Sequence, residues 1–211
     1  MSLLTDNLEI IAGRIRGAFE AQDAAREKAM PLSREVIRLS SHAIRAIHRH
    51  EFESAHHTLA EARSVLAQAK EALAACTELP NTHFLWDAEK EYAEASISLN
   101  LVVGEKIPTP EELEVDNAAY LNGMAEGASE LRRYLLDSLR KGDYSRGEEL
   151  LSAMDDIYNV LVTMDFPDSI TGGLRRTTDA LRGVLEKTRS DLTLSVQQRR
   201  LEDKLSNLNQ S

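Results

Sequence analysis

The chain is poor in cysteine, proline and glycine, and each shortage excludes a class of protein. Among 211 residues there are one cysteine (Cys76), five prolines and ten glycines. A single cysteine can form neither an intrachain disulfide nor a zinc site of the CxxC type, which favours a reducing, cytoplasmic compartment. Without a Pro-rich or Ser/Gly-rich tract, the chain has no expected linker or low-complexity segment. We therefore expect a single domain, residues 1–211, with short joints between its elements.

Long hydrophobic runs are also missing. No uncharged stretch approaches the roughly 20 residues that a membrane-spanning helix needs. The N-terminal segment has Asp6 and Glu9 within its apolar stretch and lacks a basic region, so it is typical of an amphipathic helix rather than a signal peptide. We expect no membrane partner.

Positive charge is in deficit over the whole chain. Lys and Arg number 25 against 35 Asp and Glu, which gives a formal net charge of −10. Such a field repels a polyanion, so binding to nucleic acid would need a local patch of Lys and Arg. The segment 26–50 provides a candidate patch, with Arg26, Lys28, Arg34, Arg38, Arg45, Arg49, His42, His48 and His50.

Helical periodicity extends from end to end. Apolar residues recur at steps of three and four, and no sustained alternation of period two predicts a strand, so the fold class is all-α. One apolar face in a first helix consists of Leu4, Leu8, Ile11, Ile15 and Phe19, and another in a second helix consists of Leu32, Val36, Leu39, Ala43 and Ile47. We expect each of these helices to bury its face.

Five further helices complete the prediction, over residues 51–76, 83–103, 117–140, 144–163 and 169–206. The first of these is Ala-rich, includes Cys76 as a core residue, and stops before Pro80, while the second ends at Gly104. Thr109 can cap a short turn that has Pro110 at its first position. Seven helices with short joints describe an antiparallel bundle.

The last helix is predicted to be long and has an apolar seam of Leu174, Leu181, Leu185, Leu192, Val196 and Leu201. One interpretation places this seam in the core of the chain. The other pairs it with a second copy through coiled-coil contacts, which would give oligomers. Both interpretations can hold for different parts of one helix.

Three carboxylates share one face of the predicted helix 83–103. Asp87, Glu91 and Glu94 are spaced i, i+4 and i+7, so they repel one another unless a cation lies between them. Mg²⁺ prefers oxygen ligands and keeps open positions for a phosphate, and it supports phosphodiester hydrolysis. Solvated helix faces often carry acidic runs, so this pattern alone also fits an ordinary surface.

Two later acids, Glu130 and Asp156, lie beside apolar rows in the sequence, from which they could project into the bundle toward the same site. Buried acids usually need a partner or a metal. The histidines do not fit a transition-metal site, because there is no HExxH motif, and the adjacent His56 and His57 are expected on the surface.

Several stretches resemble the translin family, which includes translin and translin-associated factor X. The most specific match is the pentapeptide GDYSR at 142–146, which is similar to a stretch of translin. EYAEA at 91–95 is similar to the EYVEA stretch of the associated factor, and the segments around LSRE at 32–35 and IHR at 47–49 resemble its LSRD and LHR stretches. The similarity extends thinly over residues 26–200.

The resemblance implies a seven-helix fold of the translin type and assembly into hollow oligomers that bind single-stranded RNA and DNA on their inner surface. It also implies a catalytic role, because the associated factor is a Mg²⁺-dependent RNase subunit and has the acidic pair that translin lacks. By this resemblance Glu91 and Glu94 match that pair, Glu130 aligns with the glutamate of a TGEL stretch, and Asp156 falls at the aspartate of a VYDGF stretch. Asp155 is the alternative to Asp156, since only one of two adjacent helical residues can face a metal.

The leading hypothesis is a homo-oligomeric endoribonuclease for single-stranded RNA. Glu91, Glu94 and Asp156 would hold Mg²⁺, or Mn²⁺ in its place, and Glu130 would be a further ligand or a general base. Nucleic acid would contact Arg34, Arg38, Arg45, Arg49 and Arg146, and the patch could extend to Arg132, Arg133, Arg140 and Lys141. A non-catalytic binding module for single-stranded nucleic acid and a helical scaffold for protein partners are the alternatives, and a second family member could complete the assembly.

Overall fold

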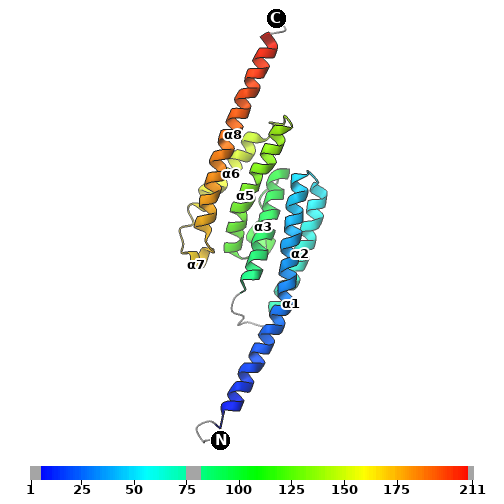
Figure 1. Ribbon diagram of the computed structural model, residues 1–211, viewed down its shortest axis with the longest axis vertical. Coiled ribbons are helices and arrows are strands. Elements are labelled where there is room, and N and C mark those ends of the chain that lie inside the picture. The colour runs from blue at the N-terminus through cyan, green and yellow to red at the C-terminus, as the bar shows by residue number, and fades with distance from the viewer. Residues whose placement is uncertain (1–5, 75–81, 209–211) are drawn as a thin grey trace.

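The computed structural model describes residues 6–74 and 82–208, and all regular structure in these ranges is helical. Within these two ranges, eight helices follow one another (Figure 1). They are α1 (Leu8–His48), α2 (Phe52–Ala74), α3 (His83–Val103), α4 (Pro110–Leu113), α5 (Asn117–Arg140), α6 (Gly147–Leu161), α7 (Asp168–Thr171) and α8 (Leu174–Leu208). Six are long and two are single turns, so the predicted all-α bundle is confirmed.

The first two predicted helices are one continuous helix, α1. The expected break was wrong because nothing between residues 20 and 30 disfavours helix: the stretch is rich in Ala, Glu, Gln, Arg and Lys, which have high helix propensity. Pro31 lies inside α1 at an exposed position and does not end the helix. α1 is therefore long enough to extend well beyond the bundle at its N-terminal end (Figure 1).

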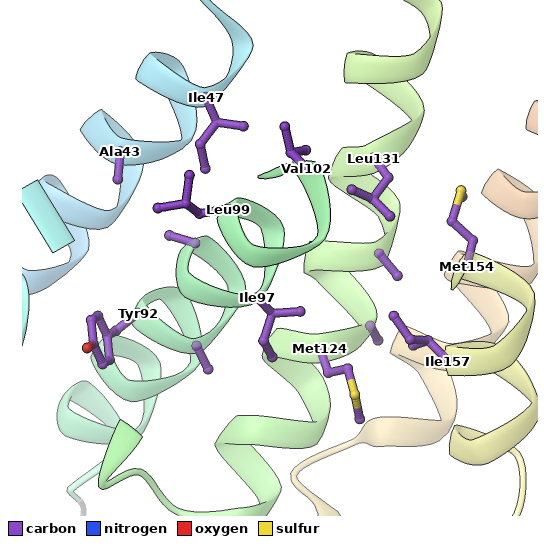
Figure 2. Close-up of a cluster of buried hydrophobic side chains, with 14 of the residues drawn as sticks. Ala43, Ile47, Tyr92, Ile97, Leu99, Val102, Met124, Leu131, Met154 and Ile157 are labelled. Carbon is purple, nitrogen blue, oxygen red and sulfur yellow. The ribbon is translucent and has the colours of Figure 1, made fainter. Parts of the chain in front are cut away.

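The long helices pack side by side in the order α2, α1, α3, α5, with α6 and α8 covering the far side of α5 (Figure 1). The core runs through this row and is formed by alanine and medium-sized aliphatic residues. Figure 2 shows its central part, where Ile47 of α1, Leu99 of α3, Leu131 of α5 and Met154 of α6 point into the space between the helices. α3 and α5 thus lie at the centre and have neighbours on both sides.

Local signals fix most of the helix ends. α3 ends at Gly104, which adopts the left-handed conformation, as predicted. Thr109 caps α4: its hydroxyl accepts from the backbone N–H of Glu112, whose side chain accepts from the N–H of Thr109. The predicted helix 169–206 is divided instead, because Gly172 and Gly173 both have positive φ and separate α7 from α8.

The N-terminal part of α1 and the C-terminal part of α8 project from opposite ends of the bundle (Figure 1). Leu8, Ile11, Ile15 and Phe19 are exposed, so the expectation that the first apolar face is buried was wrong within this chain. On α8 the seam is divided: the four leucines from Leu174 to Leu192 are buried, whereas Leu201 is exposed. The intrachain interpretation therefore holds for the first part of α8.

Three sequence expectations lie outside the described residues: the apolar contact of Leu4, the core position of Cys76 and the stop before Pro80. His56 and His57 are exposed, as predicted. Within the described ranges, every helix is too short or too polar to cross a membrane.

Candidate metal centre

The centre begins with an unusually close approach of α3 and α5. A Cβ atom added to Gly123 would lie 2.6 Å from the carbonyl oxygen of Lys90 and 2.9 Å from the backbone nitrogen of Glu94. One turn later, a Cβ on Gly127 would lie 3.0 Å from the carbonyl oxygen of Glu94. The two backbones are therefore in direct contact along residues 90–94, and only glycine fits at Gly123 without a shift of the backbone.

This contact brings three carboxylates together. Glu91 and Glu94 project from α3 and Glu126 projects from α5, in the turn between the two glycines. One oxygen from each of the three lies within 4.8 Å of the others, and all three side chains are half-buried. Among the described residues, no other group of three or more His, Cys, Asp or Glu side chains is close enough to hold a metal ion. The predicted pair of glutamates is thus joined by an acid that the sequence analysis did not select.

The ammonium group of Lys90 lies against this cluster. Its Nζ donates to Glu126 Oε2 at 2.6 Å and is 3.4 Å from Glu91 Oε1. Burial disfavours the charged amine, but the ion pairs with Glu126 and Glu91 outweigh this and raise the pKa of Lys90. The lysine remains protonated and neutralises one of the three negative charges.

Ionisation is least favourable at Glu94. Burial, followed by the charges of Glu91, Glu126 and Glu130, raises the pKa of Glu94 from its ordinary value of 4.5 to about 8. Burial is also the largest cause of the raised pKa of Glu91, which Lys90 partly offsets. Burial and mutual repulsion make it unfavourable for these carboxylates to be charged. A bound cation would stabilise the site, because its positive charge offsets that repulsion.

A pH dependence follows for the metal-free protein. Because the folded-state pKa of Glu94 is raised, the folded chain keeps a proton that the unfolded chain releases between pH 4.5 and about 8. The free energy of unfolding should therefore fall as the pH rises through this window, by at most about 1.4 kcal/mol per pH unit. Denaturant titrations in EDTA at mildly acidic and mildly alkaline pH measure this, and Glu94→Gln should weaken the dependence. An unchanged slope in that variant would contradict the assignment.

Glu130 lies one turn beyond Glu126 on α5, and its carboxylate contacts His48 of α1. Its Oε2 is 2.7 Å from Nε2 of His48, whose side chain is only 6% exposed, and the other ring nitrogen of His48 is buried without a hydrogen-bond partner. The charge of Glu130 also contributes to the raised pKa of Glu94. His48 was predicted as part of the basic surface and is instead a buried contact to this acid.

Asp156 is not brought to the cluster. The side of α6 that faces the core carries Leu150, Met154, Ile157 and Leu161, which leaves Asp156 on the exposed side. Asp155, the alternative, pairs with Arg189 of α8 at 2.5 Å. Neither aspartate belongs to the three-carboxylate group, in which Glu126 takes the third place.

The predicted basic surface of α1 is exposed to solvent. Arg34, Arg38, Arg45 and Arg49 are all exposed and follow one side of the helix. Arg38 and Arg49 pair with the neighbouring acids Glu35 and Glu51. Arg45 and Arg49 lie within one turn of His48, which contacts Glu130.

Arg146 has a different environment. Its guanidinium donates to the carbonyl oxygens of Leu101 and Val102 at the end of α3 and pairs with Glu149 at 2.6 Å. Arg146 therefore caps the C-terminal end of α3 and is not part of the basic surface of α1. Of the four residues named as a possible extension, Arg132 pairs with Asp191 at 2.7 Å, and Arg140 lies 3.4 Å from Asp137.

The rest of the GDYSR pentapeptide also serves the joint between α5 and α6. Gly142 has a φ of +78°, and the Asp143 carboxylate accepts from the N–H and hydroxyl of Ser145. The ring of Tyr144 lies 4.8 Å from the guanidinium carbon of Arg199 on α8. The motif that matched the family most specifically is therefore a structural joint.

A row of long helices with a carboxylate cluster where α3 and α5 meet defines an all-α protein with a candidate site for a divalent cation. No family model matches the sequence. The structure is similar to that of the *Archaeoglobus* C3PO bound to duplex RNA, at 33% identity and a TM-score of 0.81, over 89% of this chain and 97% of the other. A second *Archaeoglobus* C3PO structure matches at 32% identity and a TM-score of 0.78, over 89% of this chain and 98% of that one.

The chain belongs to the translin family, as the first of these relatives shows. It is also 29% identical to an uncharacterized protein of Methanocaldococcus jannaschii over 185 residues, which are 87% of this chain and 82% of the relative. A *Nematostella* C3PO without ligand shares the fold at a TM-score of 0.75 and 21% identity, over 90% of this chain and 97% of that one.

Proposed function

We propose that this protein is a Mg²⁺-dependent endoribonuclease that binds and cuts single-stranded RNA in the cytoplasm, as a homo-oligomer. The observation that carries the proposal is the convergence of Glu91, Glu94 and Glu126 at the contact between α3 and α5. Family membership supports the RNA-binding part of the proposal, because the Archaeoglobus relative was solved with duplex RNA bound.

The donor set fits the proposed ion. Mg²⁺ and Mn²⁺ take carboxylate oxygens and retain water ligands, and three half-buried carboxylates leave room for a phosphate oxygen. When bound, the ion would neutralise charge on the reacting phosphate and activate water. Glu91, Glu94 and Glu126 would hold it, and the raised pKa of Glu94 means that binding would release a proton.

Glu130 is the proposed base or further ligand. It lies one turn from Glu126 on α5, and its carboxylate is fixed by His48, so its position does not depend on the ion. A base fixed in this way can orient an attacking water and accept its proton. Asp156 has no part in this proposal, because it is exposed on α6.

RNA would reach the site along α1. The exposed arginines of α1 form a local basic surface, which can bind a phosphate backbone although the net charge of the chain is −10. This surface ends within one turn of His48. Single-stranded DNA carries the same negative charge per nucleotide and is a further proposed ligand. A second translin-family subunit is a further proposed partner.

Removing two of these arginines should weaken RNA binding through electrostatics alone. In Arg34→Ala/Arg45→Ala, the slope of log affinity against log salt should become shallower by about 0.7 for each lost contact with a single strand. Fluorescence anisotropy with a labelled single-stranded RNA over a range of salt measures this. Arg176→Ala/Lys187→Ala removes the same charge from exposed positions on α8 and should leave the slope unchanged. Equal effects of the two double variants would contradict a binding surface on α1.

The test of the function is the fate of a labelled single-stranded RNA with purified protein in Mg²⁺ and in EDTA. Cleavage in Mg²⁺ alone is the expected result. The alternative, a binding protein that does not cut, is favoured by the ion pairs of Lys90, which neutralise part of the cluster without a metal. It predicts RNA that is bound but intact under both conditions.

A further inference from the structure

The acidic cluster contains a cation of its own. Lys90 Nζ is 2.6 Å from Glu126 Oε2 and 3.4 Å from Glu91 Oε1, so it bridges two of the three carboxylates across the contact between α3 and α5. The lysine side chain is 17% exposed, and its ammonium group interacts electrostatically with Glu126, Glu91 and Glu94. A lysine held in this way is part of the site rather than a solvated surface residue.

The backbone geometry explains why the lysine reaches the cluster. Gly123 has no side chain and lies against the carbonyl oxygen of Lys90, and Glu126 follows Gly123 by one turn of α5. The Lys90 side chain therefore starts at the closest point of the two helices, from which it reaches the carboxylate of Glu126. Its sequence neighbour Glu91 contributes to the same cluster from α3.

A divalent cation and this ammonium group compete for the same carboxylates. Both are positive, and a metal ion within about 2.1 Å of the carboxylate oxygens would stand close to Nζ in a half-buried site, where repulsion is weakly screened. We propose that Lys90 is the built-in counter-ion of the cluster, that a divalent cation binds by displacing its ammonium group, and that this lysine thereby sets the metal affinity. The inference rests on the proposed metal-dependent function.

Two consequences distinguish this role from a merely structural ion pair. Without the lysine, the carboxylates should bind a divalent cation more tightly, because no ammonium group has to be displaced. The metal-free protein should at the same time be less stable, because its carboxylates repel one another without a counter-ion, and added metal should restore that stability. A structural ion pair would lose stability without any gain in metal affinity.

The experiment is a titration of the metal-free protein with Mn²⁺, in which free Mn²⁺ is measured by electron paramagnetic resonance. Lys90→Met should bind Mn²⁺ about tenfold more tightly than the wild type, or better. Lys204→Met makes the same chemical change at an exposed position on the projecting end of α8 and should match the wild type. Adding Glu94→Gln to either background should remove the tight site.

The outcomes separate this inference from the proposed function. Equal or weaker Mn²⁺ binding by Lys90→Met, with the site still lost in Glu94→Gln, would overturn the role of Lys90 and leave the metal site standing. Binding that Glu94→Gln does not change, or no binding by any variant, would overturn the proposed metal site and the inference with it. Circular dichroism checks the fold, and Lys90→Gln, which keeps a polar side chain without the charge, repeats the test if the methionine variant is unfolded.

Discussion

Glu94→Gln should abolish RNA cleavage while the protein still folds, assembles and binds RNA. Glu94 is the most buried and most strongly perturbed carboxylate of the cluster, with a pKa of about 8. In the metal-free protein near neutral pH it is largely protonated and already resembles an amide, so glutamine should preserve the packing. Glutamine does not replace the anionic ligand, however, and the loss should lower kcat on the order of a thousandfold.

Cleavage and binding should be measured in parallel, with a labelled RNA in Mg²⁺ for the rate and anisotropy in EDTA for the affinity. Asp156→Asn is the matched control, because it removes a carboxylate that the sequence selected and the structure leaves exposed on α6. It should cut RNA at the wild-type rate. A Glu94→Gln protein that keeps its activity, or an Asp156→Asn protein that loses it, would move the site away from the contact of α3 and α5.

Gly123→Ala should destabilise the protein by about 1–3 kcal/mol, although alanine normally favours a helix. The new methyl group would stand 2.6 Å from the carbonyl oxygen of Lys90, a backbone atom that cannot rotate away. α3 and α5 must then move apart, which also separates Glu126 from Glu91 and Glu94. Denaturant unfolding measures the stability, and Mn²⁺ titration should show weaker binding by the same variant.

Gly183→Ala provides the matched comparison. Gly183 lies in α8, and a Cβ added there meets nothing within 4 Å. Alanine should therefore stabilise this helix by up to about 1 kcal/mol, as it does at open helical positions. Equal stabilities of the two variants would contradict the view that the close contact at Gly123 brings the three glutamates of the cluster together.

Much of the fold could be predicted because its signals are local. The periodicity of three and four identified the helices, and Gly104 and the Thr109 capping box marked two of their ends. The exposure of Leu8 and Phe19 could not be predicted, since an apolar face does not reveal whether a neighbour is available within the same chain. The break at Gly172 and Gly173 was missed although two adjacent glycines are a turn signal.

The site was predictable only where its residues share a helix. Glu91 and Glu94 follow from their spacing on α3, whereas Glu126 depends on the register between α3 and α5, which no local pattern encodes. The available signal was Gly123 and Gly127 on either side of Glu126, since two glycines one turn apart mark a close helix contact. Lys90 was overlooked because a lysine among acids is usually solvated, and here burial makes it a member of the cluster.

The resemblance to the translin family was correct. Its most specific motif, GDYSR, nevertheless forms a structural joint between α5 and α6 and does not belong to the carboxylate cluster. Arg146 was expected to contact nucleic acid, and the structure shows its guanidinium donating to carbonyl oxygens at the end of α3. A joint requires particular residues at fixed positions, because turn geometry and capping tolerate few side chains. A match over GDYSR therefore supports the family fold and says little about the reaction.

The most direct test of the central claim is a crystal structure of the protein grown with Mn²⁺, in which anomalous scattering locates the ion. We predict a peak about 2.1 Å from carboxylate oxygens of Glu91, Glu94 and Glu126, with the ammonium group of Lys90 displaced from Glu126. A map in which Lys90 still bridges Glu91 and Glu126 and no ion lies between α3 and α5 would contradict the account.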